Sequence, residues 1–392
     1  MLKTSSYTGT KISTLGNVAT YINGRAFKPS EWEDTGIPII RIQNLTNSAA
    51  PYHYSSQGLE EKYKVKKGDL LFAWSASLGA HIWKGDDAWL NQHIFRVIPS
   101  EQIEKKYLYY FLLQVVAELY AKTHGSGMVH ITKGPFMNTP IPVPPLSEQK
   151  RIVSKIEELF SKLDASVAEL QTAKEKLKVY RQAVLKEAFT PGKDWKKLKA
   201  LDVGEVKLGR QRSPQNVSNL YPTKYIRAAN ITEQGLDLSD VLEMEFTPTE
   251  QSKYTLQEND IVISEASGSP TQVGKPALWK CELQTCCFQN TVIRHRVKEA
   301  NPEYVFWYYK YLYISGYFSR IVGGVGINHL GAKNFSNIEI PIPSVLDQTK
   351  IVQRIERVLS VYGNIEQTID TSLQQAEALR QSVLKQAFEG GL

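Results

Sequence analysis

The sequence contains one long segment twice, and this duplication restricts the fold more than any other feature. Residues 141–192 begin IPVPPLSEQKRIV and end YRQAVLKEAFTPG, while residues 340–391 begin IPIPSVLDQTKIV and end LRQSVLKQAFEGG. Gln149 and Gln348 stand 199 positions apart, as do Phe189 and Phe388, so the copies align without a gap. Self-similarity of this kind indicates that the chain consists of two copies of one structural unit.

Weaker matches extend the repeat upstream. At the same offset of 199, four residues of the first copy match four of the second, namely Gly125, Gly127, His130 and Phe136 with Gly324, Gly326, His329 and Phe335. At an offset of 186, three more pairs match, namely Arg41, Asn44 and Thr46 with Arg227, Asn230 and Thr232. Each copy is therefore a variable domain followed by a well-matched segment.

The well-matched segments are predicted to be long helices. The first is expected to start near residue 147 and the second near residue 347. Apolar residues recur in steps of three, four and seven, the spacing of a coiled-coil seam. These seam residues are Ile152, Ile156, Leu159 and Leu163 in the first copy and Ile351, Ile355, Val358 and Tyr362 in the second. Neither segment contains an internal proline, and Pro191-Gly192 ends the first. A helix from 147 to 188 is roughly 60 Å long at about 1.5 Å per residue.

A single helix of that length cannot bury its apolar stripe, so we expect the two copies to pair. Because each variable domain precedes its helix, antiparallel pairing places the two domains at opposite ends of the pair. The alternative is ordinary packing of two helices inside a single core. The length and the spacing of the apolar residues favour the rod.

The variable domains are predicted to be mixed α+β. Strands are expected at Ile37–Leu45, Gly68–Trp74, Ile94–Ile98, Lys224–Ile231 and Asp260–Ile263, and helices at Tyr107–Leu113 and Tyr304–Tyr309. The fold class is therefore α+β, with two pseudo-symmetric globular domains separated by two long antiparallel, coiled-coil helices. The predicted boundaries are 1–142 for the first domain, 143–192 for the first helix, 193–341 for the second domain and 342–392 for the second helix.

Composition places the chain among globular, mildly basic proteins. The hydrophobic content is 42%, the formal net charge +7 and the pI about 9.0. The N-terminus carries no apolar signal segment and no run is long enough to span a bilayer, so we expect a soluble, cytoplasmic protein without membrane contact. The three cysteines, Cys281, Cys286 and Cys287, are expected to be reduced thiols rather than metal ligands.

Signatures of catalysis are not convincing. The stretch GSPTQVGK at 268–275 has five residues between its glycines where a phosphate-binding loop needs four, and Pro276 follows the lysine. Asn301-Pro302-Glu303-Tyr304 approaches the Asn-Pro-Pro-Tyr element of adenine methyltransferases, but a helix start with an asparagine cap and proline at the first helical position is the better interpretation. We therefore expect no catalytic, cofactor-binding or metal-binding residues in this chain.

Two diverged domains on a rigid rod suit the reading of a two-part DNA site. Arg, Lys, Asn, Gln, Ser, Thr and His side chains in the polar loops are candidates for phosphate and base contacts. In the first domain they are Arg41, Gln43, Asn44, Ser75, Ser77, His81, Asn91, Gln92, His130, Thr132 and Lys133. In the second they are Arg210, Arg212, Arg227, Asn230, Ser267, Ser269, Gln272, Lys275, Gln289, Asn290, His329 and Lys333. Each of these residues is equally well explained as an ordinary surface polar group.

Charge alone does not make either domain a strong DNA binder. Lys and Arg exceed Asp and Glu by four over residues 1–142 and by two over residues 195–341. So small an excess of positive charge suits a DNA-binding domain whose affinity depends partly on partner subunits. For Trp74, Trp83 and Trp279, packing in the core is favoured over base stacking.

The duplicated IPVPPLSEQKRIV and IPIPSVLDQTKIV segments resemble the conserved regions of Type I restriction–modification specificity subunits. The helix ends YRQAVLKEAF and LRQSVLKQAF and the stretch Gly125–Phe136 strengthen the resemblance, which covers the whole succession of variable domain and helix. The second copy departs from the pattern with Ser344 and Asp347.

The resemblance implies a non-catalytic subunit that binds double-stranded DNA, one half of a split asymmetric site per variable domain. It implies two methyltransferase subunits as partners, docked largely on the helices, and restriction–translocase subunits. Those partners, not this chain, would use S-adenosylmethionine, ATP and Mg. It does not transfer individual base contacts.

Three other interpretations remain open. One is a recognition subunit of another defence assembly, or an orphan subunit serving methylation only. The second is a coiled-coil scaffold with two protein-binding heads. The third is a self-contained methyltransferase or nuclease, against which the incomplete cofactor motifs argue.

Overall fold

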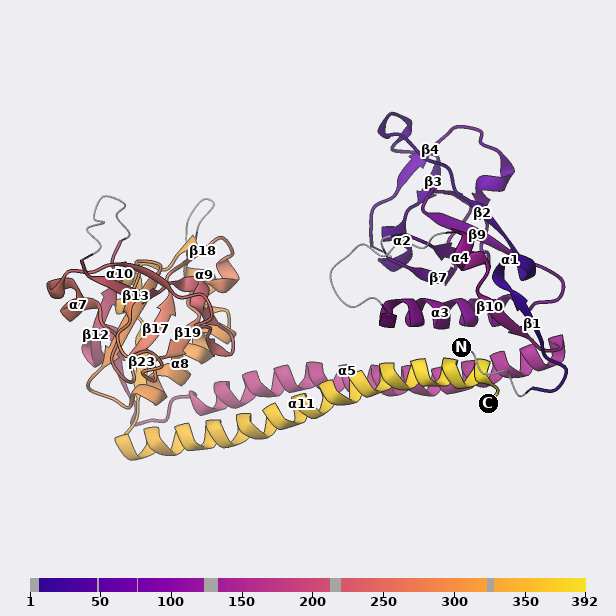
Figure 1. Ribbon diagram of the computed structural model, residues 1–392. Coiled ribbons are helices and arrows are strands. Elements are labelled where there is room, and N and C mark those ends of the chain that lie inside the picture. Colours follow the sequence, from indigo (N-terminus) through magenta and orange to yellow (C-terminus); the bar gives the residue numbers. More distant parts are fainter. Residues whose placement is uncertain (1–6, 48, 76, 123–132, 212–219, 323–327) are drawn as a thin grey trace. The chain divides into compact units, whose positions relative to one another are not determined.

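The computed structural model describes residues 7–47, 49–75, 77–122, 133–211, 220–322 and 328–392, without the side chains of 119–122 and 133. The chain forms two compact units. The first unit comprises residues 1–171 and 370–392, and the second comprises residues 172–369. Each unit therefore contains one globular domain and part of each long helix (Figure 1).

Two four-stranded sheets build the domain of the first unit. One sheet has the order β2-β9-β6-β7 and is antiparallel throughout, and the other has the order β4-β3-β8-β5, with β3 and β8 parallel. The strands are β2 (Ala19–Asn23), β3 (Ile37–Ile40), β4 (His53–Ser55), β5 (Lys64–Val65), β6 (Leu70–Ala73), β7 (Gly79–Ile82), β8 (Ala88–Leu90) and β9 (Ile94–Pro99). A separate ribbon pairs β1 (Lys11–Thr14) with β10 (Pro140–Val143).

One long helix covers the first sheet. The helices of this domain are α1 (Leu15–Val18), α2 (Ile42–Thr46), α3 (Lys105–Lys122) and α4 (Lys133–Met137), with short 3-10 turns at Pro29–Glu31 and Glu61–Tyr63. The apolar face of α3 buries Tyr107, Phe111 and Leu112 in one core with Phe72 of the sheet. Figure 1 shows α3 between this sheet and the long helices, so its buried side chains reach both.

The second unit repeats this plan. The sheet β12-β21-β17-β19 corresponds to β2-β9-β6-β7, and β16-β13-β20 corresponds to β4-β3-β8. The strands are β11 (Lys196–Lys199), β12 (Gly204–Leu208), β13 (Pro222–Ile226), β14 (Ile231–Thr232), β15 (Gly235–Leu236), β16 (Leu242–Glu245), β17 (Ile261–Ser264), β18 (Ala266–Ser267), β19 (Pro276–Leu278), β20 (Cys287–Phe288), β21 (Val292–Val297), β22 (Asn328–His329) and β23 (Glu339–Ile342). The helices are α6 (Ala200–Val203), α7 (Pro248–Tyr254), α8 (Pro302–Ile314), α9 (Tyr317–Ile321) and α10 (Ala332–Ser336), with 3-10 turns at Ala228–Asn230 and Pro270–Gln272.

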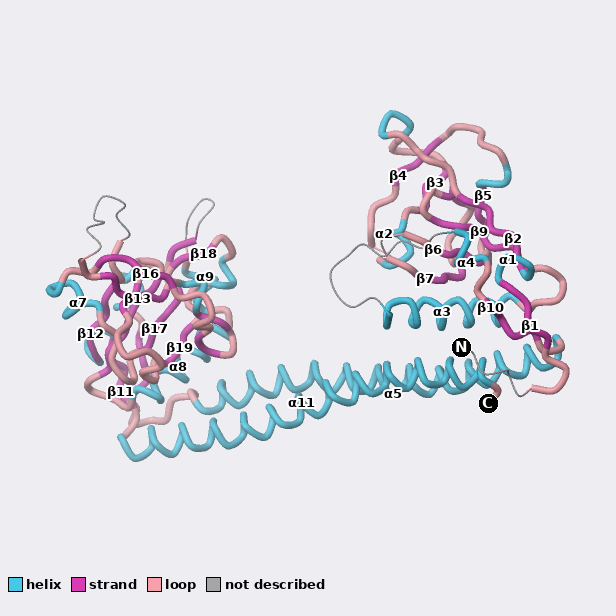
Figure 2. The backbone as a smooth tube through the Cα atoms, viewed as in Figure 1, coloured by secondary structure: helices cyan, strands magenta, loops and turns pink. Residues whose placement is uncertain are grey.

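The two long helices are α5 (Leu146–Ala188) and α11 (Val345–Glu389), drawn as continuous helices in Figure 2. They are antiparallel in each unit. In the first unit, ion pairing joins Arg380 to Asp164, and an Arg151 N–H donates to the Leu392 carbonyl oxygen at 2.8 Å. In the second unit, ion pairs join Arg181 to Glu366 at 2.8 Å and Glu187 to Arg354 at 2.7 Å. The predicted α+β class and the antiparallel direction of the helices are confirmed.

The ends of the long helices are part of the domain cores. Ile152 and Ile156 are fully buried, and they pack with α3 and the sheet of the first unit as well as with Leu384 of α11. Ile355 is buried in the same way in the second unit, where Ile351 is half-buried. The remaining predicted seam residues, Leu159, Leu163, Val358 and Tyr362, are half-buried. The seam is therefore shared between the partner helix and the domain, which a heptad pattern alone does not reveal.

A buried glutamine anchors the start of each long helix. Gln149 accepts a hydrogen bond from the Glu104 N–H at 2.8 Å and donates to the carbonyl oxygens of Gln102 and Pro144 at 2.9 and 2.8 Å. Gln348 accepts from the Asn301 N–H at 2.8 Å and donates to the Pro343 carbonyl oxygen at 2.9 Å. These matched bonds tie each helix to the loop that precedes α3 or α8.

Two predicted strands end earlier than expected. The segment Ile37–Leu45 leaves the sheet after Ile40 and forms α2, and Lys224–Ile231 leaves it after Ile226 and forms a 3-10 turn. In both places an asparagine side chain bonds to the backbone three residues earlier, which favours a turn over a continued strand. The strand expected at Ile94–Ile98 and the helices expected at Tyr107–Leu113 and Tyr304–Tyr309 are present.

Candidate nucleic-acid interface

Each domain contains a turn that is held by a buried asparagine. The side-chain Oδ1 accepts from the backbone N–H of the arginine three residues earlier, and Nδ2 donates to two carbonyl oxygens. Asn44 accepts from the Arg41 N–H at 3.0 Å and donates to the carbonyl oxygens of Ala50 and Pro51, both at 3.2 Å. Asn230 accepts from the Arg227 N–H at 2.9 Å and donates to the carbonyl oxygens of Asp237 at 2.9 Å and Asp240 at 3.1 Å. Both donor hydrogens of each amide are thereby used inside the domain. Asn44 and Asn230 shape the loops rather than offering donors to a base.

A glycine lets the polar end of β8 or β20 approach a neighbouring strand end. A Cβ atom on Gly24 would lie 2.0 Å from the carbonyl oxygen of Asn91, and one on Gly209 would lie 2.1 Å from that of Gln289. No side chain fits at either position. The predicted contact residues Asn91 and Gln92, and Gln289 and Asn290, therefore occupy equivalent places, all half-buried.

In the second unit the structure gathers several predicted residues on one ribbon and the turn beside it. Strand β18 pairs with β22, with Ala266 opposite His329 and Ser267 opposite Asn328. The Ser267 hydroxyl oxygen accepts from the Ser269 N–H at 3.2 Å. After the following 3-10 turn, Lys275 Nζ donates to Gln272 Oε1 at 2.6 Å. The β18–β22 ribbon and the turn after β18 thus carry five predicted contact residues, namely Ser267, Ser269, Gln272, Lys275 and His329.

The first unit carries a different set of groups at the corresponding edge. The indole N–H of Trp74 donates to Asn23 Oδ1 at 3.1 Å, and the Trp74 ring lies 5.4 Å from the His93 ring and 5.8 Å from Phe95, on which it stacks. Gln92 Nε2 is 3.1 Å from His93 Nε2. Trp74 packs on the core, as predicted, and its indole N–H bonds to Asn23 of this polar cluster.

Asn23 and His93 were not among the contact residues predicted from the sequence. The available signal was their position, because Asn23 precedes Gly24 and His93 follows the predicted Asn91 and Gln92. Both positions come together only through the pairing of β2 with β9, a long-range contact that local pattern does not give.

Other predicted residues are paired within the fold. Arg210 is buried, donates to Glu250 Oε1 at 2.7 Å and lies 5.2 Å over the Phe246 ring. Arg227 forms an ion pair with Asp240. His81 is half-buried, and burial lowers the pKa of its imidazole. Of four further predicted residues, Ser75 is buried, whereas Gln43, Ser77 and Lys333 are exposed and so accessible to a ligand.

Some predicted residues lie outside the described part of the structure. They are His130, Thr132 and Arg212, together with the side chain of Lys133, whose backbone begins α4. A role of these residues in DNA binding stays a prediction.

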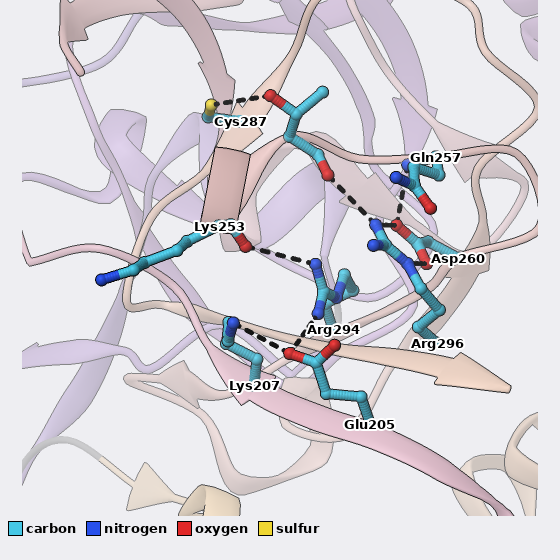
Figure 3. Close-up of polar contacts among 9 residues, drawn as sticks. Glu205, Lys207, Lys253, Gln257, Asp260, Cys287, Arg294 and Arg296 are labelled. Atoms are coloured by element: carbon cyan, nitrogen blue, oxygen red, sulfur yellow. Dashed lines mark hydrogen bonds and ion pairs between the residues drawn. The ribbon is translucent and has the colours of Figure 1, made fainter. Parts of the chain in front are cut away.

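Two partly buried ion pairs lie on the sheet of the second domain. Arg296 makes two bonds of 2.7 Å to the Asp260 carboxylate, which also accepts from the Gln257 N–H at 2.8 Å (Figure 3). Arg294 is 1% exposed and pairs with Glu205 at 2.8 Å. These groups link β12, β17 and β21, and the hydrogen bond to Asp260 raises the pKa of Arg296. The two arginines stabilise the sheet and are not available to phosphates.

Each unit also has a hollow beside the long helices. In the first unit it measures about 660 Å³ and is lined by Tyr110, Phe160, Arg380, Gln381 and Leu384, among others. In the second it measures about 850 Å³ and is lined by the equivalent Trp307, Leu359, Arg181, Gln182 and Leu185, among others. The repeat thus extends to the surface between each domain and its helix pair.

The described residues include neither a metal-binding cluster nor a membrane-spanning helix. Within these ranges no cluster of three or more His, Cys, Asp or Glu side chains is arranged to hold a metal ion. Among the described helices, none is long and apolar enough to cross a membrane.

Known proteins resemble this chain along nearly its whole length. The Escherichia coli EcoBI specificity subunit is 26% identical over 97% of this chain and 85% of its own length, and the EcoKI specificity subunit of E. coli strain K12 is 24% identical over 98% and 89%. The MjaVIII specificity subunit of Methanocaldococcus jannaschii is 22% identical over 89% and 85%.

Solved structures share the fold. A chain from a study of complex assembly and conformational transition of the type I R-M system superposes with a TM-score of 0.76 at 20% identity, covering 98% of this chain and 99% of that one. The HsdS subunit from Thermoanaerobacter tengcongensis gives a TM-score of 0.56 at 20% identity, with 98% coverage of both.

The family model decides the assignment, because it fits both halves of the repeat. The Type I restriction modification DNA specificity domain matches residues 8–175 and again residues 192–375. With two copies of that domain spanning most of its length, the chain belongs to the family of Type I restriction–modification DNA specificity proteins.

Proposed function

We propose that this chain is the sequence-specific DNA-binding subunit of a Type I restriction–modification complex. Each domain reads one half of a bipartite, asymmetric site in double-stranded DNA. The observation that carries the proposal is the double match of the specificity domain, once in each half of the chain. Membership in this family supports DNA recognition, and the duplication supports two half-sites.

The two domains support different half-sites because they place different side chains on one backbone frame. The Trp74 N–H donates to the His93 carbonyl oxygen at 3.2 Å, and the Glu265 N–H donates to that of Thr291 at 2.8 Å. These bonds make Trp74 equivalent to Glu265 and His93 equivalent to Thr291. The two domains therefore carry different groups at equivalent positions, an indole and an imidazole in one and a carboxylate and a hydroxyl in the other, which supports a different half-site for each.

The chemistry of restriction and methylation is assigned to partners. The chain supplies recognition and scaffolding without a catalytic residue of its own. Two methyltransferase subunits that use S-adenosylmethionine would modify the DNA, and restriction–translocase subunits that use ATP and Mg would cleave it. Support comes from the names of the relatives, which are specificity subunits.

The long helices offer surfaces on which methyltransferase subunits dock. Val179 and Tyr180 of α5 and Val361 of α11 are more than half exposed, and Ile365 is 41% exposed. Large apolar groups left open on a helix pair indicate a contact surface for another protein. The equivalent hollows beside the helices extend this surface to both units, in keeping with two copies of one partner.

We further propose that the helix pair sets the spacer between the half-sites. The support is that α5 and α11 are each one continuous helix contributing to both units. Two readers on one face of DNA must be separated by close to a multiple of one helical turn, about 34 Å. A fixed pair of helices would hold them to one such separation.

The test is methylome sequencing of a host that produces this chain with its methyltransferase partner. We expect methylated adenines in a single bipartite motif with a constant spacer, absent from a host that produces the methyltransferase alone. Methylation without a defined motif would refute the assignment of recognition to this chain.

A second measurement separates this function from the alternative of a protein-binding scaffold. A scaffold with two protein-binding heads would give no sequence-dependent retention of DNA in the presence of the methyltransferase. An orphan subunit serving methylation only would methylate the motif without restricting unmodified DNA in the cell. Methylation by the purified chain alone would instead revive a self-contained enzyme.

A further inference from the structure

Glu265 is a buried carboxylate immediately after β17. Its side chain is 9% exposed, and its oxygens lie 3.1 and 3.3 Å from His329 Nδ1 and 3.3 Å from the Gly331 N–H. The Leu330 N–H also donates to the Glu265 carbonyl oxygen at 2.9 Å. A buried carboxylate is costly unless donors surround it, and here the donors come from His329 of β22 and from Gly331 just after that strand. The contact therefore fixes both the ribbon and the imidazole.

The His329 ring is held at one nitrogen and open at the other. An ionised carboxylate only accepts hydrogen bonds, so Nδ1 must carry the hydrogen in the contact with Glu265. In a neutral imidazole the other nitrogen, Nε2, is then an acceptor. The side chain of His329 is 56% exposed, which leaves its outer part accessible to a ligand. A ring with a defined tautomer and an open acceptor is suited to recognising a hydrogen-bond donor.

The surroundings of His329 match the edge of a base rather than a phosphate. Ser267 and Asn328 stand opposite each other on the same two-stranded ribbon, and Ser269 follows. Lys275, which follows β18 and the 3-10 turn after it, is already bonded to Gln272. Neutral donors and acceptors on a narrow ribbon are the kind of groups that read base edges in a groove.

This arrangement belongs to the second unit. The place of Glu265 is taken in the first unit by Trp74, whose indole is a donor only and bonds to Asn23. A carboxylate that orients a histidine is therefore not available at that position of the first domain. A contact made through His329 would serve one half-site and not the other.

We propose that His329 is a specificity-determining residue that reads one base pair of the second domain's half-site. Its Nε2 accepts a hydrogen bond from the exocyclic amino group of adenine or cytosine, and Glu265 is the positioning residue that fixes the ring. This inference rests on the proposed function, since it names one contact of the domain assigned to that half-site.

The experiment uses the complex of the full chain with its methyltransferase subunits. Competition binding compares the methylated motif with duplexes in which each base pair of both half-sites is changed in turn. His329→Ala should lower discrimination at one base pair of one half-site by about 10-fold, in the range expected for a mismatched pair. His329→Gln, which keeps an acceptor, should retain part of it. Glu265→Gln should give a smaller loss at the same base pair.

A chemical probe identifies the group that is read. A duplex that carries purine in place of adenine, or a pyrimidine analogue without the amino group in place of cytosine, should bind the wild-type complex about 10-fold more weakly. The same duplex should cost the His329→Ala complex nothing further. The analogue that shows this pattern identifies whether His329 contacts adenine or cytosine.

The control variant is Glu299→Ala, an exposed residue beyond the far end of β21, at the opposite end of the sheet from Glu265. It should leave every base preference unchanged. If His329→Ala and His329→Gln keep all discrimination within 2-fold, while the first half-site is read normally, the inference is wrong. If the wild-type complex discriminates in neither half-site, the proposed function fails instead.

Discussion

His295 lies in the core of the second unit, between β12 and β17 on strand β21. Its side chain is fully buried, and its Nδ1 is 2.8 Å from the hydroxyl oxygen of Tyr309, which is buried as well. Burial lowers the pKa of His295 to about 4, against an ordinary value near 6.5. The folded domain therefore holds this imidazole neutral at pH values where the unfolded chain protonates it.

This difference predicts an acid-sensitive domain. Because the folded pKa is depressed, the stability is complete above pH 6.5 and is lost as the pH falls toward 4. Between pH 7.5 and 5.0 the wild-type chain should lose about 2 kcal/mol of unfolding free energy relative to His295→Gln, which cannot titrate. Denaturant unfolding at both pH values measures the difference. Equal pH dependence in the two proteins would contradict the assignment.

At the scale of residues, chemistry alone did not separate structural from ligand-facing groups. Asn44, Asn230 and Arg210 have the composition of DNA contacts, yet the fold uses their polar atoms internally. The carbonyl oxygens that Asn44 bonds belong to residues 50 and 51, and nothing in the sequence shows that this loop returns to it. His329 is exposed and Ser267 half-buried, and their role in DNA binding stays a prediction, while the buried Glu265 that bonds to His329 was not anticipated.

At the scale of elements, the long helices were predictable because their signals are regular and local. Apolar spacing, flanking prolines and the absence of internal proline place both helices to within a few residues of Leu146–Ala188 and Val345–Glu389. Short strands of two to five residues are set by their partners. The pairing of β3 with β8, far apart in the sequence, ends at Ile40, where the Asn44 turn begins.

The anchoring glutamines lead to a prediction about these helices. Gln149 itself is fully buried, and Gln149→Ala removes the side-chain partner of the Glu104 N–H and of the Gln102 and Pro144 carbonyl oxygens. An unpaired buried group costs about 1–3 kcal/mol, and the two partly exposed groups cost less because water can reach them, so we expect a loss of roughly 2–4 kcal/mol of unfolding free energy. Gln348→Ala should lose somewhat less. The exposed Gln353→Ala on α11 is the control and should change stability by under about 0.5 kcal/mol. Thermal or denaturant unfolding provides the comparison.

Lengthening the helices tests the proposed ruler. One helical turn inserted near Ala173–Lys178 of α5 should change the spacer and preserve both half-sites. The ion pairs of each unit fix the register of the two helices, so a matching turn near Ile369 of α11 is needed to keep Arg181 with Glu366 and Arg380 with Asp164. Methylome sequencing reads the spacer directly. An unchanged spacer in the doubly lengthened chain would refute the ruler, whereas insertion in α5 alone should also reduce stability.

At the scale of the whole molecule, the division into two units predicts independent reading. Gln92 belongs to the first unit and His329 to the second. Gln92→Ala should weaken discrimination in one half-site and His329→Ala in the other. Their free-energy effects on DNA binding should add to within about 0.5 kcal/mol, because the two residues share no partners. A larger coupling in the double variant would show that the units do not read separately.

The duplication was the part of the whole molecule that sequence predicted best. Gln149 and Gln348 match in the repeat and make equivalent hydrogen bonds, so the two copies share structure as well as sequence. The positions that differ, such as Trp74 and Glu265, could be paired only once β6 and β17 were placed in equivalent sheets. At these positions the two domains carry different side chains, so the sequences alone do not align them.

Gly24 and Gly209 have a practical consequence for anyone who wishes to engineer new motifs. With a carbonyl oxygen about 2 Å from where a Cβ would sit, every other amino acid at these two codons would push the polar end of β8 or β20 out of place. A randomised library should therefore keep both codons fixed and vary the residues of the β18–β22 ribbon and those around Trp74. Clones that lose either glycine should be recovered as insoluble or inactive protein, whatever their neighbours encode.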